Sequence, residues 1–106
     1  MIRDFVRYVA QHMAWSLQTF GGGRRTVGLT KHIAKELDEI RQAPTDLTEW
    51  VDVIILAIDG AWRAGYCAQE IADALWAKQE KNMARQWPAN VSEDEPTEHI
   101  RGIGHD

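Results

Sequence analysis

The segment from Asp46 to Ala64 constrains the fold most, because as a helix it would be apolar on nearly every side. Its large hydrophobic residues are Trp50, Val51, Val53, Ile54, Ile55, Leu56 and Ile58. A helix without a polar face must be surrounded by other elements, so we predict that this segment is the central helix of its domain. Asp46 is a favourable N-cap, Glu49 stands three residues later in capping-box position, and Gly65 follows the helix end.

Three more helices are predicted by apolar residues at helical spacing, from about Arg3 to Gln18, Leu29 to Arg41 and Ala68 to Gln86. Residues 21–23 are all glycine and end the first, Pro44 stops the chain after the second, and Trp87-Pro88 closes the last. Short connections favour antiparallel neighbours. The sequence therefore predicts an all-α, antiparallel four-helix bundle in residues 1–88, followed by a polar, acidic tail or strap in residues 89–106.

Charge and composition narrow the classes of partner. With 106 residues and a net charge of −4, the chain lacks the overall positive charge that attracts nucleic acid polymers or anionic membranes. Its longest apolar run, Val53–Ile58, is too short to span a bilayer, and the N-terminus lacks the apolar core of a signal peptide. The single cysteine, Cys67, fits a cytoplasmic protein. Five tryptophans are more aromatic surface than so small a core is expected to hide, which favours a homo-oligomer.

Two acidic pairs at the same spacing are the candidate metal-binding residues of the sequence. Glu36 and Glu39 belong to the second predicted helix, Glu49 and Asp52 to the third. Residues three apart share one helix face, and antiparallel neighbours can bring the two faces together. Four carboxylates that converge repel one another unless cations lie between them, and an all-oxygen ligand set favours Mg²⁺ or Mn²⁺ over zinc. Asp52 also lies within an apolar run, where an unpaired charge would be costly.

Simpler roles exist for the same acidic residues. A single acidic pair is more often a solvated helix face, and Glu49 alone could serve only as a capping residue. Two pairs on consecutive helices favour a metal site instead. Asp59, two turns after Asp52, either pairs with a basic residue or reaches the metal. His32 is expected to pack or to support Glu36 rather than to bind metal.

Motifs of other catalytic schemes are missing from the sequence: it has no Walker loop, no His-Glu-x-x-His, no Glu-x-x-His and no paired-cysteine zinc spacing. Glycines 21–23 precede Arg24 and Arg25. This arrangement is compatible with a flexible loop that places arginine on a polyphosphate, and equally with a simple helix terminator.

At these residues the sequence resembles the MazG-like superfamily of all-α nucleoside triphosphate pyrophosphohydrolases, whose signature is Glu-x-x-Glu on one helix and Glu-x-x-Asp on the next. Within it, the chain is similar to the dATP/dGTP diphosphohydrolase-like branch, which includes phage enzymes that deplete purine dNTPs. The resemblance covers residues 11 to 101 and is carried by residues 15–16, 19–21, 35–37, 49–56, 59–65, 77–82 and 87–88. Many members have a further Glu before the first motif Glu, where this chain has Lys35; this bears on the number of metal ions.

The resemblance implies Mg²⁺-dependent hydrolysis of purine (deoxy)nucleoside triphosphates to a monophosphate and pyrophosphate, which would shape the dNTP pool. It implies dGTP or dATP as substrate, with GTP a further candidate, and Mn²⁺ as a substitute for Mg²⁺. Two or three ions would be held by Glu36, Glu39, Glu49 and Asp52. Either Glu36 or Glu39 would orient the attacking water.

The resemblance also implies substrate contacts and an assembly. Trp15 and Phe20 are expected to stack on the base beside Ser16. The groups expected on the phosphates are Arg24, Lys78 and Asn82. The chain is expected to form a dimer or a dimer of dimers, in the host cytoplasm if a phage encodes it.

Two alternatives remain open at this stage. The chain could be a pyrimidine or damaged-nucleotide pyrophosphohydrolase with the same metal site. It could also be a non-catalytic helical interaction module whose acidic patch is solvated or meets a basic partner. Metal dependence separates the enzymes from the interaction module.

Overall fold

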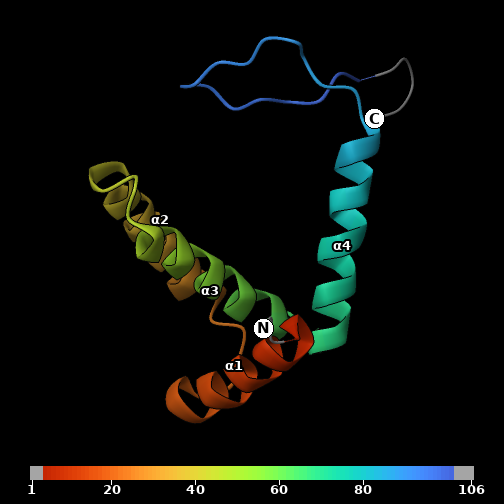
Figure 1. The fold of residues 1–106 in the computed structure, drawn as a ribbon. Coiled ribbons are helices and arrows are strands. Elements are labelled where there is room, and N and C mark those ends of the chain that lie inside the picture. The colour runs from red at the N-terminus through yellow and green to blue at the C-terminus, as the bar shows by residue number, and fades with distance from the viewer. Residues whose placement is uncertain (1–3, 102–106) are drawn as a thin grey trace. The chain divides into compact units, whose positions relative to one another are not determined.

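The computed structural model describes residues 4–101, which form four α-helices and no β-strand (Figure 1). These helices are α1 (Phe5–Phe20), α2 (Thr26–Gln42), α3 (Leu47–Arg63) and α4 (Ala68–Ala84). The all-α prediction is confirmed. None of these helices is long and apolar enough to cross a membrane. The chain divides into two compact units between Ala72 and Asp73, and the predicted domain boundary at residue 88 remains a prediction.

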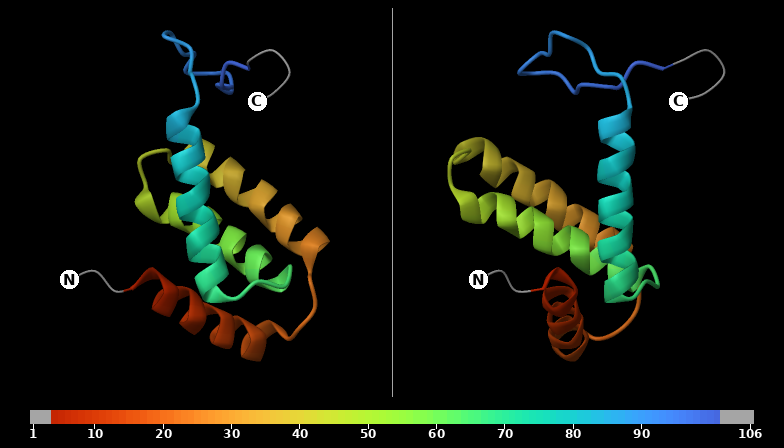
Figure 2. Two further views of the ribbon diagram at one scale, coloured as in Figure 1. Left: turned by 90° about the vertical axis from the view of Figure 1, so that its right-hand side faces the viewer. Right: turned by 45° about the vertical axis from the view of Figure 1, so that its right-hand side comes forward.

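In the first unit, α3 is the central helix, as predicted. It lies antiparallel beside α2 after a short turn, and α1 packs against it as well (Figure 2). The core of this unit is small, and its buried hydrophobic residues are Val9, Leu29, Ile40 and Ile58. This packing places the acidic residues of α2 beside those of α3.

The ends of the helices follow local chemistry, with some shifts from the predicted bounds. Asp46 caps α3 as predicted, and its carboxylate accepts hydrogen bonds from the backbone N–H and the hydroxyl of Thr48 at 3.0 and 2.7 Å. The backbone N–H of Asp46 donates to the carbonyl of Ala43, so Glu49 does not serve the capping box that its position suggested. The side chain of Glu49 is thereby left for another role.

Several helix bounds are shifted by one to three residues from the prediction, and one predicted bound lies outside the described residues. The predicted start of the first helix, Arg3, is not described, and α1 begins at Phe5 after the N-cap Asp4. Helix α2 begins at Thr26, three residues before the predicted Leu29, because the chain turns into the helix at Arg25 with a left-handed backbone (φ 50°). Helix α4 ends at Ala84, two residues earlier than predicted.

In the second unit, the chain after α4 folds back on itself. The N–H of Ile100 donates to the carbonyl of Gln86 at 2.7 Å, in an isolated antiparallel bridge. Nearby, the rings of His99 and Trp87 pack in a T-shaped arrangement, with 5.9 Å between the ring centres. The indole N–H of Trp87 donates to the carbonyl of Asn82 at 2.7 Å. These contacts give the polar segment a defined local path.

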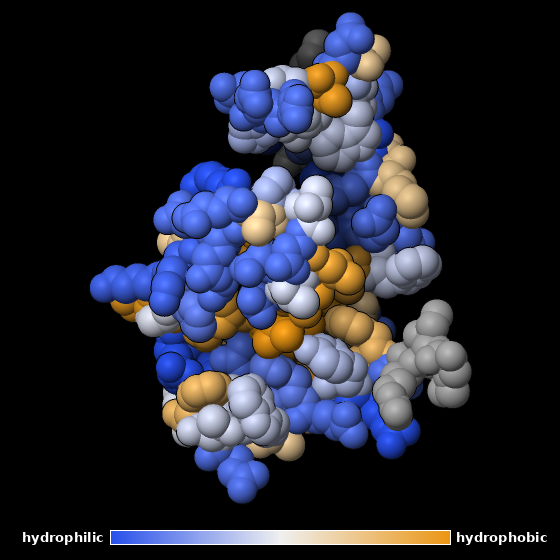
Figure 3. Space-filling model, turned by 60° about the vertical axis from the view of Figure 1, so that its left-hand side comes forward, coloured by the Kyte–Doolittle hydropathy of each residue, from blue (hydrophilic) through white to orange (hydrophobic). Residues whose placement is uncertain are grey.

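Hydrophobic side chains reach the surface of this chain, including some on α3, the helix predicted to be surrounded by other elements. Within α3, Trp50 is 49% exposed and Ile54 is 54% exposed. Helix α4 contains no buried residue. Figure 3 shows hydrophobic surface between hydrophilic regions. The two neighbours of α3 therefore cover only part of its apolar circumference.

The small core makes a specific prediction about stability. Replacing Ile58 by alanine, at a site only 7% exposed, should lower the free energy of unfolding by about 2–5 kcal/mol, because the change leaves a cavity between α3 and its neighbours. Leu47→Ala on the same helix is the matched control; Leu47 is 73% exposed, and its loss should cost less than about 1 kcal/mol. Urea unfolding monitored by circular dichroism measures both. Equal losses would contradict the assignment of the core.

Candidate active site

Four carboxylates converge between α2 and α3, as the sequence predicted. Glu36 and Glu39 come from α2, and Glu49 and Asp52 come from α3. One oxygen from each lies within 4.8 Å of an oxygen of every other. The convergence follows from the i,i+3 spacing on two antiparallel helices joined by a short turn.

The electrostatics of this acidic cluster are unfavourable without a counter-charge. The hydrogen bond with Glu39, burial, and the charges of Glu39 and Asp52 raise the pKa of Glu36. Burial and the same neighbour raise the pKa of Glu49. The pKa of Glu39 is lowered, because it accepts hydrogen bonds from Glu36 and Glu49. Glu36 and Glu49 thus ionise less readily than isolated carboxyl groups, because ionisation brings like charges together.

The chemistry of the cluster fits a hard divalent cation. Two buried oxygens, Glu36 Oε2 and Glu49 Oε2, have no hydrogen-bond partner in the structure, which is costly for carboxylates. The other oxygen of Glu36 lies 3.1 Å from Nε2 of His32, which fixes how the carboxylate is turned. An all-oxygen set with unpartnered ligand atoms is what Mg²⁺ or Mn²⁺ requires. His32 thus supports a carboxylate, in agreement with its predicted role.

A cavity of about 310 Å³ lies beside the cluster, within the size range of small-molecule sites. Glu36 and Asp52 contribute to its lining, and so do the aromatic residues Trp15 and Phe20. The two rings meet edge to face, with 5.4 Å between their centres. The same cavity is therefore lined by carboxylates that suit a metal ion and by aromatic rings that suit a planar base.

The residues expected to bind substrate are distributed over both units. Trp15, Ser16 and Phe20 line the cavity. Arg25 lines it too, with its guanidinium 5.1 Å from the centre of the Phe20 ring, whereas Arg24 is not among the lining residues. Because consecutive residues at a helix start point in different directions, the sequence alone did not separate the two arginines.

Lys78 and Asn82, the other residues expected to bind phosphate, lie one turn apart on α4. They belong to the second unit, where the side-chain carbonyl of Asn82 accepts a hydrogen bond from Arg85 at 3.0 Å. Their predicted contact with phosphates stays a prediction.

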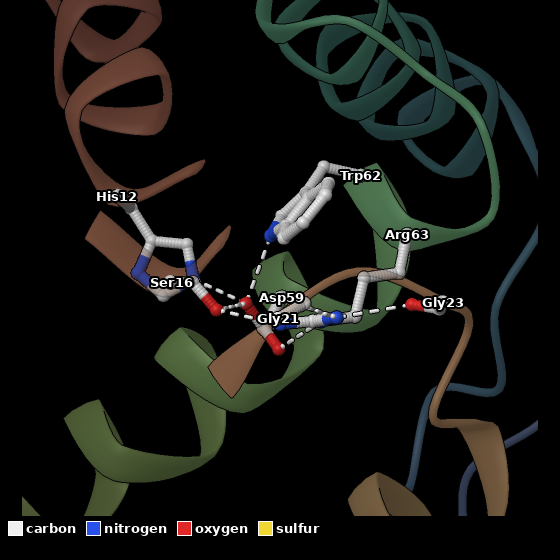
Figure 4. Close-up of polar contacts among 7 residues, drawn as sticks. All are labelled: His12, Ser16, Gly21, Gly23, Asp59, Trp62 and Arg63. Atoms are coloured by element: carbon white, nitrogen blue, oxygen red, sulfur yellow. Dashed lines mark hydrogen bonds and ion pairs between the residues drawn. The ribbon is translucent and has the colours of Figure 1, made fainter. Parts of the chain in front are cut away.

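Asp59 is the centre of a buried hydrogen-bond network, the Asp59 network (Figure 4). Its Oδ1 accepts from the hydroxyl of Ser16 at 2.5 Å and from the indole of Trp62 at 2.8 Å, and it lies 2.9 Å from Nε2 of His12. Its Oδ2 accepts from Nε of Arg63 at 2.7 Å. Of the two roles considered for Asp59, the structure shows the ion pair with a basic residue.

The protonation of Asp59 reflects these partners. Burial alone raises the pKa of a carboxyl group, but the hydrogen bonds from Ser16, Arg63, Trp62 and His12 outweigh burial and lower it to about 2. Asp59 therefore stays ionised throughout the neutral range.

Two residues of this region were not identified from the sequence, His12 and Arg63. A signal was available for both. Asp59 and Arg63 are four apart on one helix, the spacing of an ion pair, and His12 and Ser16 share the same spacing on α1. Nothing in the spacing indicated that the two pairs meet.

The fold and the acidic cluster define a class: an all-α domain with convergent carboxylates beside a cavity, suited to metal-assisted hydrolysis. Comparison with protein families is more specific, because the model described as dATP/dGTP pyrophosphohydrolase matches residues 8–106. The chain belongs to this family and is a hydrolase that acts on nucleoside triphosphates. No curated protein and no solved structure matched the chain.

The lowered pKa of Asp59 predicts how stability depends on pH. A carboxyl group with a folded-state pKa near 2, below its ordinary 3.8, stabilises the fold above about pH 4 and loses this contribution as the pH falls toward 2. The difference in unfolding free energy between wild type and Asp59→Asn should therefore shrink by about 2 kcal/mol between about pH 6 and pH 2. Urea titrations at each pH measure it.

The control for this titration is Asp38→Asn. Asp38 pairs with Arg41 at 3.0 Å on the exposed side of α2, where both side chains are in solvent. Exposed ion pairs contribute little, so the control should differ from wild type by less than about 1 kcal/mol at every pH. A pH-independent difference for Asp59→Asn would show that its ionisation does not stabilise the fold.

Proposed function

We propose that this chain hydrolyses dATP and dGTP, and also GTP, to the nucleoside monophosphate and pyrophosphate with Mg²⁺ or Mn²⁺. The observation that carries the proposal is the acidic cluster, in which two buried carboxylate oxygens lack partners beside a cavity that also holds two aromatic rings. The family match supports the substrate class and favours purines over the pyrimidine alternative. It likewise favours an enzyme over an interaction module.

The acidic cluster would hold two or three ions through Glu36, Glu39, Glu49 and Asp52. Bound there, the ions would neutralise the triphosphate and lower the pKa of a water for attack on phosphorus. Glu36 is best placed to orient that water, because His32 holds one of its oxygens and the other is unpartnered. Glu39 lies within the cluster close to both Glu36 and Glu49, which suits a ligand shared between ions.

The base would lie against Trp15 and Phe20, where aromatic faces and edges offer stacking surface. Ser16 donates its only O–H to Asp59, so toward a base it could act only as an acceptor. We propose that the triphosphate is contacted by Arg24, Lys78 and Asn82, whose donors would stabilise the leaving pyrophosphate.

In the cell, the proposed reaction would shape the purine dNTP pool of the cytoplasm, which is the host cytoplasm for a phage-encoded chain. The Glu-x-x-Glu and Glu-x-x-Asp pairs on α2 and α3 support a place in the MazG-like superfamily. The family match names the narrower branch.

An assay with each nucleotide tests the reaction. Incubation with Mg²⁺ should convert dATP and dGTP to monophosphate and pyrophosphate faster than dCTP or dTTP, as read by ion-exchange chromatography. Glu39→Gln and Asp52→Asn should each lower the rate by roughly 10²-fold or more, because each removes a charge from a preorganised electrostatic site. Omitting the metal or adding a chelator should abolish the reaction.

The matched control for this assay is Asp38→Asn. It makes the same change from carboxylate to amide on α2, one residue before Glu39, but Asp38 is exposed and paired with Arg41. Its rate should stay within about twofold of wild type. Diphosphate and orthophosphate as products would show attack at the wrong phosphorus, and pyrimidines cut fastest would overturn the purine preference.

We also propose that the chain forms a dimer or a dimer of dimers through the exposed apolar part of α3. Trp50 and Ile54 are about half exposed, which is unusual for large hydrophobic residues of a central helix. Contact with a second copy would remove this surface from water.

Light scattering tests the proposed assembly. At micromolar concentration the mass should be two or four times the 12.1 kDa of one chain. Ile54→Glu should shift the distribution toward the monomer, because a charge placed in an apolar interface is costly. Val27→Glu, at an exposed residue of α2, is the control and should leave the mass unchanged. A monomeric wild type would contradict the proposal.

A further inference from the structure

All three nitrogens of the Arg63 guanidinium group donate hydrogen bonds inside the protein. None of these hydrogen bonds goes to a residue of the acidic cluster. Its side chain is 0% exposed, and its Nε donates to Asp59. Its Nη2 donates to the hydroxyl of Ser16 at 3.0 Å. Its Nη1 donates to the carbonyls of Gly21 and Gly23, at 2.9 and 3.0 Å (Figure 4). One buried cation thus joins α3 to α1 and to the segment that follows α1.

The segment held by Arg63 has little conformational preference of its own. Gly21 and Gly23 have φ angles of 82° and 91°, a region that favours glycine. Three consecutive glycines have many alternative conformations, and ordering them costs conformational entropy. The two hydrogen bonds from Arg63 select one of these conformations by fixing the direction of two carbonyls.

The same segment sets the position of an aromatic wall of the cavity. Phe20 precedes the glycines and Arg25 follows them, and both line the cavity. Phe20 meets Trp15 edge to face on one side, and the guanidinium of Arg25 lies over its ring. A shift of the glycine carbonyls would move Phe20 and Arg25 relative to Trp15, whereas the acidic cluster on α2 and α3 would stay in place.

We propose that Arg63 is a positioning residue that holds residues 21–23 against α3 and thereby shapes the aromatic end of the cavity for the purine. The proposal rests on the proposed function for its substrate, but the holding of the glycine segment does not. Arg63 should accordingly govern nucleotide affinity rather than the chemical step, because the carboxylates are positioned by other contacts.

The test replaces Arg63 by lysine, which retains a charge beside Asp59. Lysine has one nitrogen in place of three, so it cannot serve Asp59, Ser16 and both carbonyls together. In Arg63→Lys, KM for dATP and dGTP should rise roughly tenfold or more, while kcat stays within about threefold. The Kd for an α,β-methylene analogue of dATP should rise with KM. Without nucleotide, hydrogen exchange in peptides that contain residues 21–25 should become faster.

Two further variants separate this role from general damage. Arg41→Lys makes the same change at an exposed ion pair on α2 and should leave KM, kcat and exchange unchanged. Ser16→Ala removes one contact of Arg63 with little change in volume, so it should show a smaller rise in both exchange and KM. It also serves if Arg63→Lys does not fold. A direct contact between Ser16 and substrate would raise KM without faster exchange.

The outcomes are distinguishable. Unchanged exchange in folded Arg63→Lys would overturn the claim that Arg63 holds the glycine segment. Faster exchange with unchanged KM and Kd would overturn the link between that segment and the cavity. A fall in kcat equal to the rise in KM would also overturn it. If wild type hydrolysed no triphosphate, the proposed function would fail, while exchange and analogue binding would still decide the role of Arg63.

Discussion

The packing of α1 on α3 depends on the ionised carboxylate of Asp59. A buried charge is costly unless hydrogen-bond partners replace its hydration. Asp59 has such partners on both α1 and α3. Ser16 and His12 reach it from α1, and Trp62 and Arg63 from α3. The same contacts that compensate the charge therefore fix the angle and register of the two helices. Removing any one donor would leave the others arranged around an under-solvated anion.

Asp52 and Asp59 lie two turns apart on one helix, yet they differ in the hydrogen-bond partners and charges around them. Asp59 has donors enough for both oxygens, and its pKa falls to about 2. Asp52 belongs to a cluster in which Glu36 and Glu49 have raised pKa values and each have one unpartnered oxygen. Both residues line the same cavity. A carboxylate with donors on both oxygens stabilises the fold, whereas carboxylates with unpartnered oxygens are open to a cation, as the proposed function requires.

The sequence predicted the helices and the acidic cluster because both depend on short-range spacing. Acidic residues three apart on adjoining antiparallel helices meet for geometric reasons alone, whatever the details of packing. The contacts of Arg63 with Gly21 and Gly23 join positions forty residues apart and depend on the path of a glycine segment, which spacing does not determine. Spacing likewise does not determine that Arg25, and not Arg24, lines the cavity.

Helix α3 directs carboxylates toward a neighbouring helix and leaves large apolar residues exposed, which is the reverse of the usual arrangement. This reversal connects the candidate active site to the proposed assembly. Its carboxylates Glu49 and Asp52 face α2, where the cavity lies. Leu47, Trp50, Ile54 and Ile58 follow one another at intervals of three and four and so form one apolar stripe. Only the last of them is buried in the single chain. Leu47, Trp50 and Ile54 therefore form an exposed apolar part of α3 in the single chain. In the proposed assembly, a second apolar surface would remove this part of α3 from water.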